Sequence, residues 1–137
     1  MQETLEALEL QRIKLHQQLK AVGDFRPGTI SVNFRKCGKK NCCCARADHA
    51  GHGPQYLWNT TRRGQSRAQN LRMGLELEKV RKELENHTIF LRLCQELVEV
   101  NEKICHLRPI QEVKDEKELE ALKKKLQKQF WARWHKK

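Results

Sequence analysis

The sequence has few aromatic residues and no long hydrophobic run. Phe, Trp and Tyr together make up 6% of its 137 residues, which is too little to fill the core of a large enzyme domain with a deep pocket. No apolar segment reaches the ~18–20 residues that a membrane-spanning helix needs. The N-terminal segment also lacks the apolar core of a signal peptide. We therefore expect a small cytoplasmic chain that does not insert into a membrane.

Acidic residues are almost missing from residues 29–74, where nine Lys and Arg accompany a single Asp. This segment has a net charge of +8, out of +11 for the whole chain. Residues 113–137 carry a further +5, whereas residues 1–28 are neutral and residues 75–112 carry −2. Positive charge concentrated in this way predicts a polyanionic partner, and nucleic acid is the commonest one.

Alternating polar and apolar residues predict a small antiparallel sheet in the basic segment. The expected strands are residues 29–36, 55–61 and 65–71, with Arg62–Gly64 as the turn between the last two. Before them, residues 3–22 show the heptad-like leucine spacing of a helix.

The C-terminal half shows helical periodicity, with two apolar stripes between residues 75 and 107. The first stripe is Leu77, Val80, Leu84, His87, Leu91, Cys94, Val98, Asn101 and Cys105. The second stripe is Phe90, Leu93, Leu97, Val100, Ile104 and Leu107. A double stripe is wider than one partner helix covers, so residues 77–107 are expected to contact more than one element. The N-terminal helix, the sheet, a second copy of the chain and a larger protein are the alternatives.

These patterns predict an α+β fold in four segments. An N-terminal helix (residues 1–26) precedes a basic three-stranded module with a Cys/His loop (27–74). A long coiled-coil-like helix or helical pair (75–108) and a basic C-terminal helix (109–137) follow, the latter expected over residues 113–135.

Four of the six cysteines lie within eight residues, and two histidines follow them. In a cytoplasmic chain, clustered thiols favour metal binding over disulfides. The preferred ligands for a structural Zn²⁺ are Cys37, Cys42, Cys44 and His52. His49 is the alternative fourth ligand, and Cys43 is expected to point away because neighbours in an extended segment face opposite sides. Nearby lysines lower thiol pKa values, so a metal- or thiol-sensing regulator is a further hypothesis.

Polar and basic side chains around the strands are candidates for nucleic-acid contacts. A sheet can enter the major groove, where Asn, Gln and Arg contact base edges while Lys and Arg bind phosphates. The candidates are Asn33, Arg35, Lys36, Lys39, Lys40, Arg46, Arg62, Arg63, Arg67 and Gln69. Tyr56 and Trp58 either pack in the sheet core or stack on the bases of a single strand. We expect DNA rather than RNA as the partner.

The motif CGKKNCCCA, followed by HGPQYLW, RRGQSRAQNL and a long helical segment, resembles a family of small prokaryotic proteins of unknown function. The resemblance covers about residues 27–108 and implies that Cys37, Cys42, Cys44 and His52 matter, in proteins often encoded near mobile genetic elements. The extra Cys43 and the longer ADHAGHGP connection depart from the family pattern. In layout alone, three strands before a helix resemble the arm-type DNA-binding modules of phage integrases.

These features predict a zinc-stabilised accessory or regulatory protein that binds DNA through its basic sheet and is linked to a mobile element. The alternative is a helical adapter that docks a larger nucleic-acid enzyme, with a purely structural zinc loop. No phosphate-binding loop and no Ser/His/Asp arrangement is evident in the sequence, so we expect no enzymatic activity.

Overall fold

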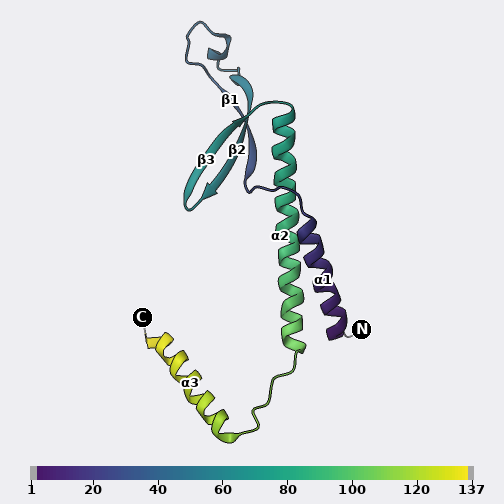
Figure 1. Cartoon of the computed structure of the whole chain (residues 1–137). Coiled ribbons are helices and arrows are strands. Elements are labelled where there is room, and N and C mark those ends of the chain that lie inside the picture. Colours follow the sequence, from purple (N-terminus) through teal and green to yellow (C-terminus); the bar gives the residue numbers. More distant parts are fainter. Residues whose placement is uncertain (1–2, 136–137) are drawn as a thin grey trace. The chain divides into compact units, whose positions relative to one another are not determined.

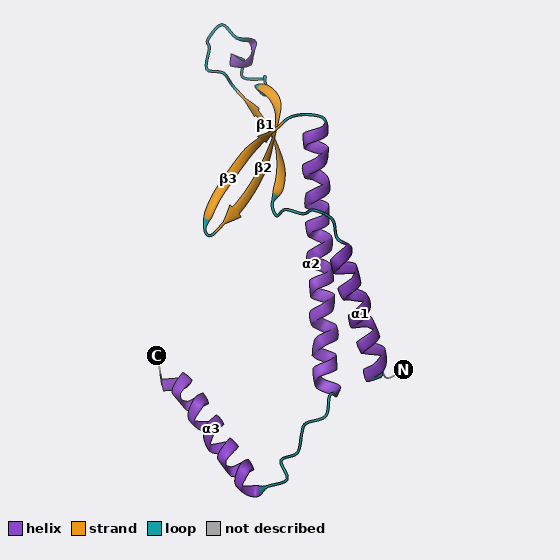
Figure 2. Ribbon diagram, viewed as in Figure 1, coloured by secondary structure: helices purple, strands orange, loops and turns teal. Residues whose placement is uncertain are grey.

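The computed structural model describes residues 3–135 and confirms the predicted α+β class. In chain order, its elements are α1 (Leu5–Ala21), β1 (Thr29–Arg35), η1 (Cys43–Ala45), β2 (His52–Arg62), β3 (Gln65–Leu71), α2 (Leu75–Leu107) and α3 (Glu116–His135) (Figures 1 and 2). Within the described range, no helix is both long and apolar enough to cross a bilayer. The predicted terminal segments also include residues 1–2 and 136–137, which lie outside the described residues.

The three strands form one antiparallel sheet in the order β1-β2-β3. β2 begins at His52, three residues before its predicted start, and His52 pairs with Arg35 at the end of β1. Gly51 permits this pairing: its φ is +113°, and a Cβ there would lie 2.8 Å from the Arg35 carbonyl carbon. The sequence pattern missed this extension because glycine and proline normally mark a break in a strand.

A two-residue turn joins β2 and β3, because Arg62 pairs directly with Gln65. Both central residues have positive φ, 52° at Arg63 and 77° at Gly64, as in the type I′ turns that suit a twisted hairpin. Arg63 therefore occupies a left-handed position that favours Asn or Gly.

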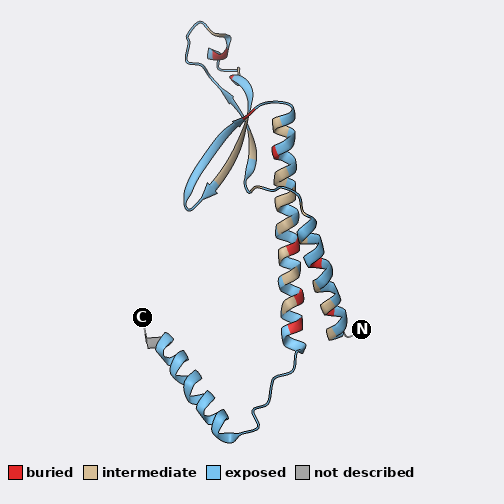
Figure 3. Ribbon diagram, viewed as in Figure 1, coloured by how far each residue is buried: buried red, intermediate tan, exposed pale blue. Residues whose placement is uncertain are grey.

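α1 packs antiparallel to α2 and covers the second of the two apolar stripes. Their shared core consists of Leu8, Leu15, Leu93, Val100 and Ile104 (Figure 3). The Lys103 Nζ–Glu3 Oε1 ion pair, 3.1 Å long, lies at one end of this pair. Arg12, which interrupts the leucine pattern of α1, donates a 3.3 Å hydrogen bond to Asn101 Oδ1. The N-terminal helix thus covers much of the wide apolar face.

The segment between α1 and β1 connects the sheet to α2. α2 is one continuous helix, with no break at His87. Phe25 stacks on Phe90 with ring centroids 4.6 Å apart, and the Arg26 guanidinium pairs with Glu83 at 3.0 Å. The same guanidinium lies 4.6 Å from the centroid of the Trp58 ring in β2. These contacts hold one face of the sheet against the helical part.

The chain divides into two compact units, residues 1–104 and 105–137. In the second unit, α3 begins at Glu116 rather than at the predicted Val113, because Asp115 Oδ1 accepts a 3.0 Å hydrogen bond from the Lys117 N–H and caps the helix. Its apolar residues Leu122, Leu126 and Phe130 are exposed.

Candidate metal centre

The sheet register brings two of the four predicted ligands together. Arg35 ends β1 and lies opposite His52, so Cys37, two residues further along, is held beside the histidine. The intervening loop must return within fourteen residues, from position 38 to position 51. Because strand pairing fixes both ends of the loop, Cys37 and His52 together form one side of the site.

The short helix η1 places the other two ligands. Cys42 is its N-cap, and Cys44 within it is completely buried. The backbone N–H of Cys37 donates to Cys44 Sγ at 3.4 Å, which ties this turn to the end of β1. Lys36 Nζ also donates to the Arg46 carbonyl at 3.0 Å and braces the loop from outside.

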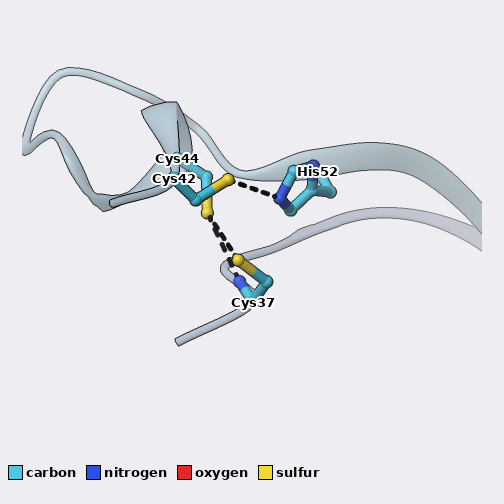
Figure 4. A group of neighbouring side chains, drawn as sticks. All are labelled: Cys37, Cys42, Cys44 and His52. Carbon is cyan, nitrogen blue, oxygen red and sulfur yellow. Dashed lines mark hydrogen bonds between the residues drawn. The ribbon is translucent and has the colours of Figure 1, made fainter. Parts of the chain in front are cut away.

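The four ligand atoms form a compact cluster (Figure 4), all within 4.8 Å of one another. Cys37 Sγ lies 3.4 Å from Cys44 Sγ, and Cys42 Sγ lies 3.2 Å from His52 Nε2. Sulfur ligands about 2.3 Å from a tetrahedral Zn²⁺ would be separated by about 3.8 Å. The cluster is therefore close to the required size, and Cys37, Cys42, Cys44 and His52 can together hold a metal ion.

Hydrogen bonds inside the cluster stabilise thiolate forms, which are the forms that bind metals. The pKa of Cys42 is lowered to about 6, chiefly by a hydrogen bond with the Cys44 backbone and then by the side chains of Cys44 and Cys37. The pKa of Cys37 is also lowered, chiefly by a hydrogen bond with the Lys39 backbone.

The other two ligands hold their protons more strongly. For Cys44, a hydrogen bond with the Cys37 backbone lowers the pKa, but burial and the neighbouring thiols raise it on balance. The pKa of His52 is raised, chiefly by its hydrogen bonds with Cys37 and then Cys42. Metal binding must displace these protons, because only neutral His and deprotonated Cys act as ligands.

His49 and Cys43 lie outside the cluster. His49 Nδ1 accepts a 3.0 Å hydrogen bond from the Gly51 N–H, so the ring stabilises the loop just before His52. Cys43 is exposed, whereas Cys44 beside it is buried. The predicted orientation of Cys43 is thus found, but in a 3₁₀ turn rather than in an extended segment.

Strand pairing assigns the sheet residues to two faces, because directly opposite residues share a face. The amide face consists of Thr29, Ser31, Asn33, Gln55, Leu57, Asn59, Thr61, Ser66, Ala68 and Asn70. The aromatic face consists of Ile30, Val32, Tyr56, Trp58, Thr60, Arg62, Gln65, Arg67, Gln69 and Leu71.

The proposed nucleic-acid contacts therefore do not share one surface. Asn33 lies on the amide face, whereas Arg62, Arg67 and Gln69 lie on the aromatic face. Arg63 is at the hairpin turn. The remaining basic candidates are at the end of β1 or in the loop of residues 36–51 (the metal-binding loop), which contains three of the four candidate metal ligands. Within each strand, the sequence correctly predicts which residues alternate between the two faces. Which residues of different strands share a face is determined only by the register of their pairing.

Sequence reasoning also passed over two amides of the amide face, Gln55 and Asn70. Each belongs to a strand whose alternation was recognised, and aligning the three alternating patterns would have placed them beside Asn33 and Asn59. Trp58 belongs to the sheet–helix contact, since its Nε1 donates to the Pro27 carbonyl at 2.8 Å.

Comparison with known proteins identifies the family but no characterised relative. No curated protein and no solved structure shows significant similarity to the chain. A family model described as a domain of unknown function, DUF6788, matches residues 5–82, which is more than half of the chain. The match includes α1, the metal-binding loop, the sheet and the first turns of α2. The chain therefore belongs to the DUF6788 family.

Proposed function

We propose that this protein is a zinc-stabilised nucleic-acid-binding accessory protein that contacts DNA through its basic sheet module. The observation that carries the proposal is the exposure of the Lys and Arg side chains in residues 29–74 and their near lack of acidic partners in the described part of the chain. All nine are exposed, and among the described residues only Arg72 has a carboxylate partner, Glu76 at 3.4 Å. Eight exposed cations without a carboxylate partner are typical of a segment that binds phosphates, although these eight are distributed over the sheet, its hairpin turn and the loop after β1.

The helices offer a direct contrast. On α2, Lys79 pairs with Glu83 at 2.9 Å, and Arg81 pairs with both Glu78 and Glu85. These ion pairs are local and neutralise most of the helix surface. The positive field of the first unit therefore originates in the sheet and its metal-binding loop.

The Cys3His cluster supports a binding role for this module. Zn²⁺ with four protein ligands has no open position for a substrate or a reactive water, which is the arrangement of structural zinc sites. We therefore assign the metal a stabilising role, and we propose no catalytic activity. Association with a mobile element remains a prediction from the family resemblance.

Salt-dependent binding tests the proposal. With about 4–6 phosphate contacts, raising salt from 50 to 200 mM should weaken duplex binding by roughly two to three decades. Replacing Arg62, Arg63 and Arg67 together by Gln should weaken binding and lower the salt slope by about 0.9 for each phosphate that the variant no longer neutralises. Fluorescence anisotropy of a labelled duplex measures both quantities.

The matched control removes the same charge from the second unit, by replacing Lys123, Lys124 and Lys125 with Gln. This variant should bind with an almost unchanged salt slope. If instead it loses binding while the arginine variant keeps it, α3 is the contact surface. If the wild-type protein binds no duplex, single-stranded or RNA probe at low salt, the proposed function is wrong.

A second candidate function is that of a helical adapter or homodimer, which a separate row of exposed residues favours. On α2, Leu91 is 53% exposed and Val98 is 57% exposed, although both belong to the first apolar stripe. On α1, Leu10 and Ile13 are exposed to a similar degree. Leu91 and Val98 are seven residues apart, the spacing of a helix–helix seam. A monomeric mass at every concentration, with no protein partner captured, would exclude this candidate.

A further inference from the structure

The ten residues of the amide face include no charged side chain, although they lie in the most basic segment of the chain. Arg35, two residues after Asn33 in β1, lies beyond the register shift that ends this regular pairing. Eight of its ten residues carry an amide or hydroxyl group, and none of the ten is buried. Among the described residues, the side chains of Asn33, Gln55 and Asn70 make no hydrogen bond within the protein. Their donors and acceptors point to a ligand that offers complementary polar groups.

The opposite face cannot serve equally well, because part of it is covered. Leu71 is 6% exposed, and the ring of Trp58 lies beneath the Arg26 guanidinium. The segment between α1 and β1 occupies this side of the sheet through Pro27 as well. The amide face is thus the side of the sheet that a large partner can approach.

Its dimensions fit one groove of one kind of duplex. Three strands spaced about 4.8 Å apart make a surface about 10 Å wide. The major groove of B-DNA is about 12 Å wide, whereas its minor groove is about 6 Å wide. The major groove of A-form RNA is deep and too narrow for such contacts.

The charge distribution is complementary to that groove. Base edges in the major groove offer neutral donors and acceptors together with the thymine methyl group, and amides, hydroxyls and small apolar groups match them. The groove is about 8.5 Å deep, which exceeds the reach of an Asn or Gln side chain, so a sheet inserted there lies between the phosphates. Arg63 lies at the hairpin end of the sheet and Lys39 lies in the loop at its other end, so each end of the inserted sheet has a cation for a phosphate contact.

We propose that the amide face enters the major groove of duplex DNA, where Asn33, Gln55 and Asn70 contact base edges and determine sequence preference. This inference rests on the proposed function and adds the face, the groove and the residues that select the sequence. It also reassigns Gln69, a candidate base contact from the sequence, to the face that does not enter the groove.

Isosteric charge changes on the two faces test the inference with matched variants. Gln55→Glu and Asn70→Asp add two carboxylates to the amide face, whereas Gln65→Glu and Gln69→Glu add two to the aromatic face. Each zinc-loaded full-length protein is used to select from duplex DNA with a randomised central segment. Guanine N7 on the wild-type protein's selected duplex is then probed with dimethyl sulfate, because N7 lies in the major groove.

We expect the wild-type protein to enrich a defined sequence and to protect guanine N7 within it. The amide-face variant should lose roughly 5- to 150-fold in preference for that sequence over random duplex, whereas the aromatic-face variant should keep it. Equal loss in both variants, binding without any sequence preference, or preference for duplex RNA would overturn the inference. In each of these cases, binding that still depends on Arg62, Arg63 and Arg67 would leave the proposed function standing.

Discussion

At the scale of single residues, Arg63 is unusual because its backbone is held in a conformation that its side chain does not favour. Its φ of 52° belongs to the left-handed region, where a residue with a Cβ has a conformational cost that glycine avoids. Asn-Gly is the preferred pair in a type I′ turn, yet this hairpin has Arg-Gly. Arg63 thus places a cation at the tip of an exposed hairpin, although its left-handed backbone has a conformational cost. A contact between this side chain and a phosphate would explain why the cost is tolerated.

Arg63→Asn should therefore change stability and binding in opposite directions. The substitution relieves the left-handed strain and should stabilise the protein by up to about 1 kcal/mol. It also removes one phosphate contact, so DNA binding should weaken and its salt slope should fall by about 0.9. Thermal unfolding and anisotropy titrations measure the two effects. Unchanged DNA affinity would show that the Arg63 side chain is not a contact.

At the scale of elements, the two apolar stripes of α2 have different environments although they look alike in sequence. Leu93, in the second stripe, is 4% exposed in the core with α1, whereas Leu91, two residues earlier in the first stripe, is 53% exposed. The single N-terminal helix can cover only one side of a face this wide. The first stripe is therefore left accessible at Leu91 and Val98, although Val80 near the start of the helix is buried.

Leu93→Ala and Leu91→Ala make a matched pair that measures this difference. Both changes remove the same atoms from the same helix, and Leu and Ala have similar helix propensities. Leu93→Ala should lower the free energy of unfolding by about 2–5 kcal/mol, because it leaves a cavity in the core. Leu91→Ala should cost less than about 1 kcal/mol in urea denaturation of the zinc-loaded protein. A large, concentration-dependent loss of stability from Leu91→Ala would instead reveal a second copy packed on the first stripe.

At the scale of the whole molecule, the sheet module and the helical pair have separate sources of stability. The described buried hydrophobic residues lie mostly on α1 and α2, and only Cys44 and Leu71 belong to residues 29–74. A sheet with so little core cannot offset the loss of backbone entropy on folding without help. Metal binding at the Cys3His cluster would supply that help, since binding energy at such sites is folding energy.

Chelation should therefore unfold part of the chain and leave the rest folded. On adding EDTA, the NMR amide signals of residues 29–71 should collapse to unfolded positions, whereas those of α1 and α2 should stay dispersed. Cys42→Ser should mimic chelation, because removing one thiolate from a site worth about 10–16 kcal/mol leaves it unable to hold Zn²⁺ tightly. Cys43→Ser is the control and should bind one equivalent of zinc by elemental analysis. An intact sheet in metal-free protein would contradict the stabilising role of the metal.

Most of the helices and strands could be predicted from local sequence patterns, whereas some of their boundaries could not. Alternation over residues 29–36 and helical periodicity over residues 75–107 identify strand and helix, because side-chain periodicity reflects local backbone geometry. The boundaries at His52 and Glu116 were missed, because they depend on a glycine pressed against Arg35 and on the Asp115 cap. Neither interaction produces a periodic signal.

The sequence alone determined the kinds of element, the uneven charge and the thiol-rich composition of the candidate metal centre, since each is a property of residues close together in the chain. Only the tertiary structure decided which histidine joins the cluster, which side of α2 packs against α1 and which face of the sheet each candidate contact occupies. His49 and His52 are equivalent by residue type, and they differ because β2 pairs with β1 as far as Arg35. Asn33 and Gln69 look alike as polar strand residues, but strand register places them on opposite faces. Register and packing are long-range properties, so periodicity within one segment cannot specify them.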